Sequence, residues 1–144
     1  MTEYKTSIEI KAPPERVWEV MRDVQRWHEW TQSITSIKPL SQGSFEVGYR
    51  FIIRQPKLPM ALWKITELNE GKTFSWVSGI PLIFRTTAIH SVEGSRKGAL
   101  VKLTVRYNGL LGSMLAQMTK EITERYLSLE ANGLRERSES AVPH

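Results

Sequence analysis

The stretch LIFRTTAIHSVEGSRKGALVKLTVRYNG, residues 82–109, decides the fold. Apolar and polar residues alternate on both sides of the turn residues GSRK, which predicts two long strands joined as an antiparallel hairpin. The expected register sets His90 opposite Val101. One face of the hairpin is then mostly apolar and carries Phe84, Ala88, Val92, Leu103 and Val105. A second layer of the protein has to cover that face.

Further strands precede this hairpin. Residues 4–11 alternate between mostly apolar and mostly charged side chains, which predicts a half-buried first strand. Residues 33–58 predict two strands around the turn SQGS, and residues 60–78 predict a hairpin around NEGK. The chain is therefore expected to form an antiparallel sheet with one apolar face.

A long amphipathic helix follows the last strand, with Ser113 as its expected N-cap residue. It ends at Asn132-Gly133 or runs on to Arg137. Because no other element is long enough, we expect this helix to cover the apolar face of the sheet. Its apolar stripe recurs at spacings of three and four residues and comprises Leu115, Met118, Ile122, Tyr126 and Leu129.

Two short helices are expected in APPERVWEVMRDVQRWHEW, residues 12–30. Trp27 and Trp30 lie where the second helix turns back toward the sheet, and they either close the mouth of a cavity or anchor the helix. His28 and Glu29 look like an acid/base pair. Adjacent helical residues point in different directions, however, so we interpret both as exposed polar residues.

These segments carry a family resemblance. IEIKAPPERVWEVMRDVQRWHEW, RQPKLPMALWKITELNEGKTFSW and RYLSLEANGLRER resemble the START-like superfamily, also called SRPBCC, in its bacterial polyketide cyclase/dehydrase and lipid transport branch. The resemblance covers essentially the whole chain and implies one START-like domain, residues 1–144. It also implies an α+β helix-grip fold, in which a curved antiparallel sheet of about seven strands surrounds a long C-terminal helix and two short helices follow the first strand.

Members of this branch include aromatase/cyclases, carriers of lipids and other hydrophobic ligands, coenzyme Q-binding proteins and chaperone co-activators. What they share is an apolar cavity between sheet and helix, and the fold alone does not choose among them. The leading hypothesis is a non-enzymatic protein that binds a lipid, a quinone or a polyketide-like molecule. One alternative is an enzyme of the aromatase/cyclase or dehydratase type using the same cavity. A second is a chaperone-associated interaction module using the convex charged face.

The residues expected to bind the ligand come from the inward faces of the sheet and the long helix. They are Trp30, Tyr49, Phe51, Ile53, Trp63, Trp76, Phe84, His90, Leu103, Val105, Tyr107, Leu115, Met118, Ile122 and Tyr126. The tyrosines and His90 are the expected polar groups. His90 is the one weak candidate for a catalytic acid or base, and the sequence places no carboxylate clearly on the inward face, which favours the carrier over the enzyme.

Composition excludes several other classes. The 144 residues include no cysteine, so thiol nucleophiles, thiolate metal sites and disulfides are excluded. The three histidines are far apart and no metal or phosphate motif appears, so we expect neither a metal nor a cofactor. The net charge of +5 is spread along the chain, which indicates a solvated surface rather than a nucleic-acid footprint. No signal peptide or membrane span is visible, so we expect a cytoplasmic monomer or dimer.

Overall fold

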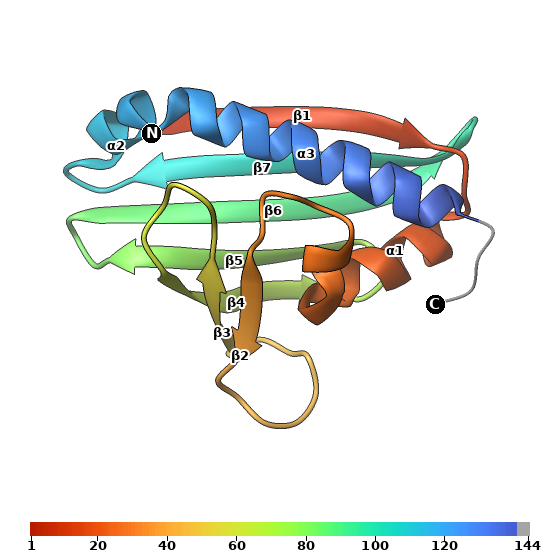
Figure 1. Ribbon diagram of the computed structural model, residues 1–144, viewed down its shortest axis with the longest axis horizontal. Helices are drawn as coiled ribbons and strands as arrows, with labels where there is room; N and C mark the ends of the chain where they lie inside the picture. Colours follow the sequence, from red (N-terminus) through yellow and green to blue (C-terminus); the bar gives the residue numbers. More distant parts are fainter. Residues whose placement is uncertain (141–144) are drawn as a thin grey trace.

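The computed structural model describes residues 1–140 and contains one antiparallel sheet of seven strands in the order β1-β7-β6-β5-β4-β3-β2 (Figure 1). The strands are β1 (Thr2–Ile10), β2 (Ser36–Pro39), β3 (Arg50–Arg54), β4 (Ala61–Asn69), β5 (Thr73–Ile80), β6 (Phe84–Ser95) and β7 (Gly98–Asn108). The helices are α1 (Pro14–Arg22), the 3₁₀ helix η1 (Val24–Glu29), α2 (Gly112–Met118) and α3 (Lys120–Glu139).

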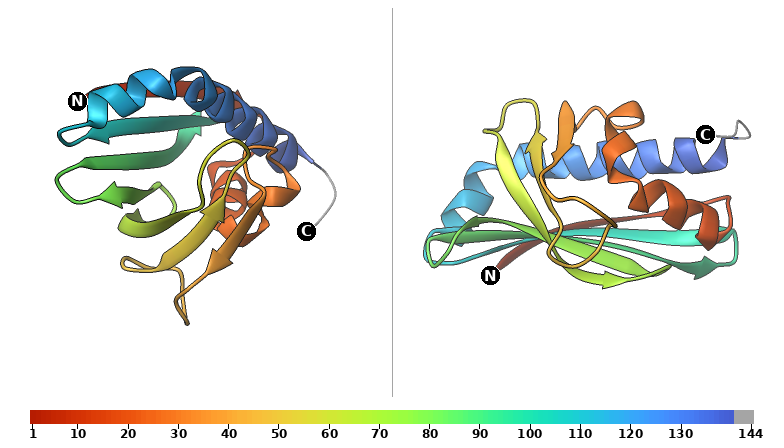
Figure 2. Two further views of the ribbon diagram at one scale, coloured as in Figure 1. Left: turned by 60° about the vertical axis from the view of Figure 1, so that its left-hand side comes forward. Right: turned by 90° about the horizontal axis from the view of Figure 1, so that it is seen from below.

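The sheet curves around α3, and α1 and η1 cover the same concave side (Figure 2). This is the expected helix-grip arrangement of the α+β class, which the structure confirms. Each strand contributes one apolar face to the concave side, because side chains alternate along a strand. The layer between sheet and helices therefore holds the apolar interior.

The β6–β7 hairpin is present, but its expected register is wrong by two residues. His90 pairs with Leu103 rather than with Val101. Ser95 pairs with Gly98, so the two strands are joined through the residues between them instead of through the four-residue turn GSRK. An even shift preserves the two faces of a strand, and His90 still points toward the helix side with its predicted neighbours.

The strands β2 and β3 are shorter than the sequence predicts. They are separated by residues 40–49, and Val47 is 58% exposed there. Tyr49 precedes β3, and its backbone carbonyl accepts a hydrogen bond from the N–H of Ile65 at 2.9 Å. The alternating pattern of residues 47–53 is therefore only partly used for a strand.

The C-terminal helix differs from its prediction in two ways. It is broken at Thr119, whose φ of −108° ends α2 before α3 begins, and Ser113 does not cap either helix. Its buried side is also rotated away from the predicted stripe, since Met118 is 76% exposed. Small and polar residues occupy much of the buried side of α3, which comprises Thr123, Tyr126, Leu127, Ala131, Gly133, Leu134 and Ser138. A search for large apolar residues at helical spacing misses such a face.

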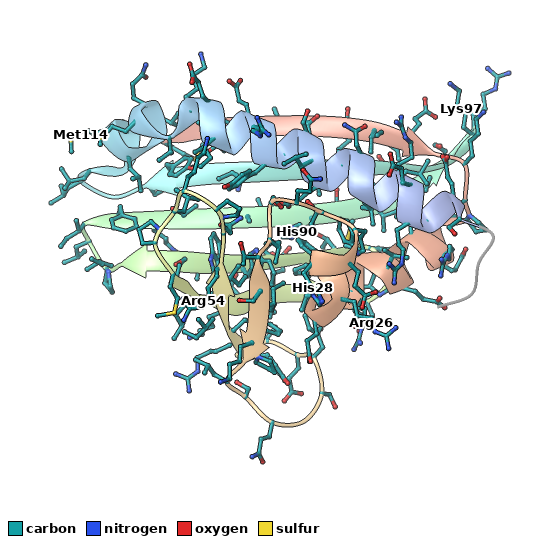
Figure 3. All side chains as sticks on the ribbon, in the orientation of Figure 1. Arg26, His28, Arg54, His90, Lys97 and Met114 are labelled. Atoms are coloured by element: carbon teal, nitrogen blue, oxygen red, sulfur yellow. The ribbon has the colours of Figure 1, made fainter. Side chains whose placement is uncertain are left out.

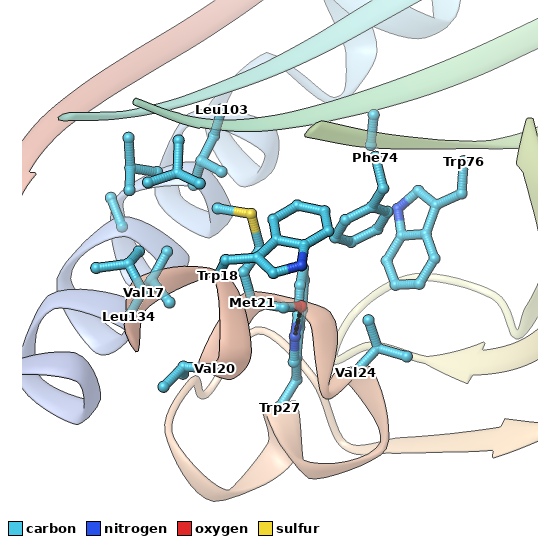
Figure 4. Packing of buried hydrophobic residues seen from close by; sticks show 14 of the residues in the cluster. Val17, Trp18, Val20, Met21, Val24, Trp27, Phe74, Trp76, Leu103 and Leu134 are labelled. Atoms are coloured by element: carbon cyan, nitrogen blue, oxygen red, sulfur yellow. Dashed lines mark hydrogen bonds between the residues drawn. The ribbon is translucent and has the colours of Figure 1, made fainter. Parts of the chain in front are cut away.

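The core lies where α1 and η1 meet the sheet (Figure 4). Trp18 packs edge-on against Phe74 with ring centroids 6.3 Å apart, and Trp27 lies 5.5 Å from Trp76. The indole N–H of Trp27 donates to the backbone carbonyl of Met21 at 2.9 Å, which fixes the ring. Of the two roles considered for Trp27, the anchor is thus the one seen in the packing.

An apolar tip projects at one end of the sheet, where the β5–β6 connection lies beside the β7–α2 connection (Figure 1). The backbone N–H of Leu110 donates to the carbonyl of Leu82 at 3.2 Å, and these two leucines are 88% and 85% exposed. The other members of the tip are Ile80, Ile83, Leu111 and Met114. Among residues 1–140, none of the helices combines the length and the hydrophobicity needed to cross a bilayer.

Candidate functional site

A cavity of about 310 Å³ lies between the concave face of the sheet and the helices. Strands β3 to β7 supply one side of its wall and helices α2 and α3 the other, while η1 and the β3–β4 connection complete it. Most wall residues are aliphatic or aromatic, as in small-molecule pockets generally. The cavity is therefore the first place to look for a ligand site.

The structure brings together nine of the fifteen residues expected to bind a ligand. Ile53, Trp63, Trp76, Phe84, His90, Val105, Tyr107, Leu115 and Tyr126 line the cavity. Their role in binding stays a prediction. Parity along the strands explains the seven from the sheet, since a single pattern of alternation fixes which side chains face inward.

The other six lie elsewhere. Phe51 and Leu103 are buried in the packed core, and Tyr49 lies beside them with its ring 5.0 Å from that of Phe51. Trp30 packs on Trp27 at 5.2 Å and borders an outer groove. Met118 and Ile122 line a surface groove on the outer side of the helix, because the inward face of the helix is rotated from the predicted stripe.

Several wall residues were not predicted. Trp27, Thr123, Leu127 and Glu130 face the cavity. Residues 58–61 of the β3–β4 connection also line it; the proline-punctuated stretch RQPKLPM, residues 54–60, is typical either of a turn at a cavity rim or of a solvated loop. A signal for the helix was present, because Thr123, Leu127, Glu130 and Leu134 recur at spacings of three and four. Thr123 and Glu130 are polar, so this face looks less apolar than the predicted stripe of Leu115, Met118, Ile122, Tyr126 and Leu129.

His90 sits in the cavity wall, in the middle of β6 (Figure 3), and is only 3% exposed. Its ring stacks on Phe74 with centroids 4.3 Å apart and meets the edges of Trp27 and Trp76. Its Nδ1–H donates to the backbone carbonyl of Phe74 at 3.2 Å, because a carbonyl oxygen can only accept. Burial lowers the pKa of His90 to about 4. At neutral pH the imidazole is uncharged, and its Nε2 is a hydrogen-bond acceptor.

Glu130 brings a carboxyl group to the cavity, which corrects the expectation that the inward face lacks one. The Ser33 hydroxyl donates to its Oε2 at 3.0 Å, and Ser33 in turn contacts the Thr31 hydroxyl at 2.9 Å. Burial raises the pKa of Glu130 to about 7, against the lowering effect of the Ser33 hydrogen bond. The group therefore changes charge near neutral pH.

A second polar group of the cavity is a cluster of hydroxyls. The Tyr107 hydroxyl lies 2.7 Å from Oγ1 of Thr123 and 3.3 Å from Oγ1 of Thr119, and the Thr119 hydroxyl donates to the Leu115 carbonyl at 2.8 Å. Tyr126 donates to the backbone carbonyl of Pro56, and burial raises its pKa. These hydroxyls can both donate and accept hydrogen bonds.

The two polar groups lie at opposite ends of the cavity. Thr86 pairs with Tyr107, whereas His90 lies four residues further along β6, about 13 Å away at the rise of a strand. On α3, which runs in the same direction (Figure 1), Glu130 lies seven residues beyond Thr123, or about 10 Å. We call the end at His90 and Glu130 the inner end, and the end at Tyr107 and Thr123 the outer end. The outer end lies beside the apolar tip, since Phe84 and Leu115 adjoin tip residues in the chain.

Trp63 adds an unsatisfied donor to the wall. Its ring lies 5.9 Å from that of Trp76, and its Nε1 is buried without a hydrogen-bond partner among the residues that the structure describes. A buried N–H without an acceptor costs about 1–3 kcal/mol. This indole is therefore a further polar contact point in an otherwise apolar wall.

His28 and Glu29 lie outside this site, as exposed residues of η1. Glu29 accepts a hydrogen bond from Arg137 at 2.6 Å, and this contact holds the pKa of Glu29 below its usual range. Glu29 thus ties η1 to α3 instead of facing a substrate. Within residues 1–140, no group of three or more His, Asp or Glu side chains is arranged to hold a metal ion.

Comparison with protein families gives a match over nearly the whole chain. The family model described as polyketide cyclase/dehydrase and lipid transport matches residues 1–139. No curated protein matches the sequence.

Solved structures share the fold. TTHA0849 from Thermus thermophilus has a TM-score of 0.77 at 18% identity, covering 99% of this chain and 100% of that one. XoxI from Bacillus cereus has a TM-score of 0.73 at 19% identity, and the alignment covers 100% of both chains. The Zhui aromatase/cyclase from Streptomyces sp. R1128 has 0.73 at 13% identity, covering 96% of this chain and 93% of the other. At these identities the likeness concerns the fold alone.

Proposed function

Because this chain belongs to the polyketide cyclase/dehydrase and lipid transport family, we propose that it binds one hydrophobic small molecule in the cavity between the sheet and α3. The observation that carries the proposal is the composition of the cavity wall. Indole and aliphatic groups form most of it, and a small number of polar groups, among them His90, Glu130 and Tyr107, interrupt it. Burying apolar ligand surface there contributes about 25 cal/mol per Å², and the end groups orient the ligand.

The size of the cavity favours a compact ligand. Small-molecule pockets range from about 300 to 1,000 Å³, and this one, at about 310 Å³, lies at the lower end. A ring system or a short chain fits such a volume better than a long acyl lipid. A ligand with a compact apolar body is therefore favoured over a long acyl lipid.

An enzyme remains the second candidate, and Glu130 is the observation that favours it. An acid/base enzyme needs a proton donor and an acceptor at one spot. The neutral His90 and the Glu130 carboxyl, whose pKa of about 7 allows either state, lie at the same end of the cavity. Turnover of a bound aromatic substrate that Glu130→Gln abolishes while binding survives would establish this function instead.

The binding function is tested by native mass spectrometry of the protein purified from its source organism. We expect a co-purified small molecule, and we expect Ala88→Leu to remove it, because Ala88 lines the cavity at the centre of β6. The matched control is Ala99→Leu, which adds the same atoms to the packed core, where Ala99 is fully buried and does not line the cavity.

The two variants should also differ in stability. Ala88→Leu fills empty space, whereas Ala99→Leu overpacks the core and costs about 1–3 kcal/mol. An Ala88→Leu variant that keeps the ligand with undiminished affinity would place the ligand outside this cavity and overturn the proposal.

A further inference from the structure

The inner end of the cavity offers acceptors and no positive charge. Nε2 of His90 accepts, because Nδ1 carries the proton donated to Phe74. Among residues 1–140, a single hydroxyl, that of Ser33, donates to the Glu130 carboxyl, and no lysine or arginine lines the cavity. A carboxylate placed there is a half-buried charge without a cationic partner, which is costly for the folded protein.

Aromatic rings occupy the wall next to these acceptors. Trp27 and Trp76 meet at 5.5 Å, and each approaches the His90 ring to within 5.5 Å. Trp63 extends the same wall beyond Trp76. The face of an indole ring attracts a cation, and the attraction grows when water is excluded.

We propose that the ligand of this cavity carries a protonated nitrogen at one end of a compact apolar body, and that this ammonium group binds at the inner end against Glu130 and the indole rings. The inference rests on the proposed function, since it names the ligand class of the same cavity. The ammonium supplies the missing counter-charge and donates hydrogen bonds to Glu130 and to Nε2 of His90.

The same arrangement rejects acids. A carboxylate at the inner end meets the Glu130 carboxylate and the lone pair of Nε2, and no donor from a cation compensates it. An alcohol can donate one hydrogen bond there and gains nothing from charge. The expected order of affinity for one apolar body is therefore ammonium, then hydroxyl, then carboxylate.

Ammonium binding is linked to the ionisation of Glu130. The titratable groups that share the cavity are His90, Tyr107 and Tyr126; burial keeps His90 uncharged at pH 7 and raises the pKa of Tyr126. On the packed elements Arg137 pairs with Glu29, Arg26 pairs with Asp23, and Glu139 accepts from the backbone N–H of Lys11, whereas the charge of Arg125 on α3 acts on Tyr126. With the pKa of Glu130 at about 7, affinity for an ammonium should rise about tenfold from pH 6 to pH 8.

The test uses three probes with one phenylbutyl body, namely 4-phenylbutylamine, 4-phenylbutanol and 4-phenylbutyrate, titrated calorimetrically into the intact protein. The amine stays protonated throughout, since alkylamines have pKa values of about 10. At pH 8 we expect the amine to bind about tenfold more tightly than the alcohol, and the acid more weakly than both.

Glu130→Gln keeps the shape and the acceptor for Ser33 but removes the charge. It should weaken the amine about 30-fold, change the alcohol less than threefold, strengthen the acid and abolish the pH dependence. Glu124→Gln removes an exposed carboxyl from the same helix and is the matched control. If Glu130→Gln does not fold, the pH profile of the wild-type protein decides the question.

The possible outcomes are distinct. Alcohol binding without a preference for the amine, or amine binding that Glu130→Gln leaves unchanged, overturns this inference and leaves the proposed function standing. Failure of all three probes, together with the absence of a co-purified molecule, overturns the proposed function as well.

Discussion

At the scale of single residues, His90 and Glu130 respond to pH in opposite senses although burial acts on both. Burial disfavours the charged form, which for His90 is the protonated one and for Glu130 the deprotonated one. The folded pKa of His90 is therefore low, at about 4, and that of Glu130 is high, at about 7. Each shift is a free-energy difference between the folded and the unfolded chain.

These shifts predict a stability profile. Between pH 4 and 6.5 the unfolded chain holds more protons on His90, so stability rises with pH, by about 3 kcal/mol in total. Between pH 4.5 and 7 the folded chain holds more protons on Glu130, so stability falls with pH by a similar amount, about 3 kcal/mol. We expect the two effects nearly to cancel in the wild-type protein between pH 4.5 and 6.5.

Substitution should expose the cancellation. Glu130→Gln leaves the His90 effect unopposed, so its free energy of unfolding should rise steeply to pH 6.5 and exceed that of the wild type at pH 8. Urea denaturation at pH 4.5, 5.5, 6.5 and 8 measures both profiles, with Glu124→Gln as the baseline. Parallel curves for wild type and Glu130→Gln would show that the Glu130 carboxyl is solvated.

At the scale of elements, α3 passes so close to the end of η1 that one position has no room for a side chain. A Cβ added at Gly133 would lie 2.0 Å from the backbone carbonyl oxygen of Trp30. Glycine in the middle of a helix costs about 1 kcal/mol relative to alanine. Here that cost allows the helix to touch the segment that carries Trp27 and Trp30.

Gly133→Ala should therefore destabilise the protein despite the better helix propensity of alanine. We expect a net loss of about 1–3 kcal/mol, because the helix and the Trp30 backbone have to separate. Gly94→Ala is the control, since its Cβ would meet only the Pro14 side chain at 3.8 Å. Urea unfolding compares the two variants, and a neutral Gly133→Ala would mean that the helix can shift without cost.

The elements also show what sequence can predict. The inward-facing side chains of the strands were predictable, because alternation along a strand has a period of two. A register error of two residues therefore leaves both faces of the hairpin intact. The inward face of α3 could not be predicted in this way. Its residues Thr123, Ala131 and Gly133 are small or polar, and they allow close contact with other elements instead of forming an apolar stripe. The break at Thr119 then rotates α2 relative to any single stripe drawn through both helices.

At the scale of the whole molecule, some residues of the cavity wall could be predicted from the sequence and others could not. Its strand residues, including Trp63 and Trp76, follow from local patterns in the sequence. Glu130 reaches the cavity only through the tertiary arrangement of α3, which no local pattern encodes. Of the polar groups in the wall, His90 and Tyr107 followed from strand alternation, whereas the Glu130 carboxyl was the part that the sequence left undetermined.

The apolar tip is a second property of the molecule as a whole. Leu82 and Leu110 are almost fully exposed, so replacing both with asparagine should change the free energy of unfolding by no more than about 0.5 kcal/mol. Asparagine also tolerates the left-handed backbone of Leu82, whose φ is +69°. Urea unfolding of the double variant checks this.

The same double variant should separate two populations of bound dye. Fluorescence of anilinonaphthalene sulfonate on the tip should fall in the variant, whereas fluorescence displaced by 4-phenylbutanol should stay. Loss of the displaceable fraction would instead mean that the tip forms part of the ligand site.

The contact at Gly133 has a consequence for the route by which a ligand can reach the cavity. It leaves no room for a side chain between α3 and the Trp30 backbone, so a ligand cannot pass between these two segments. The exposed Pro59 and Met60 of the β3–β4 connection line the cavity on another side. Ligand exchange would then depend on how readily this connection moves, because the packed contact at Gly133 offers no alternative route.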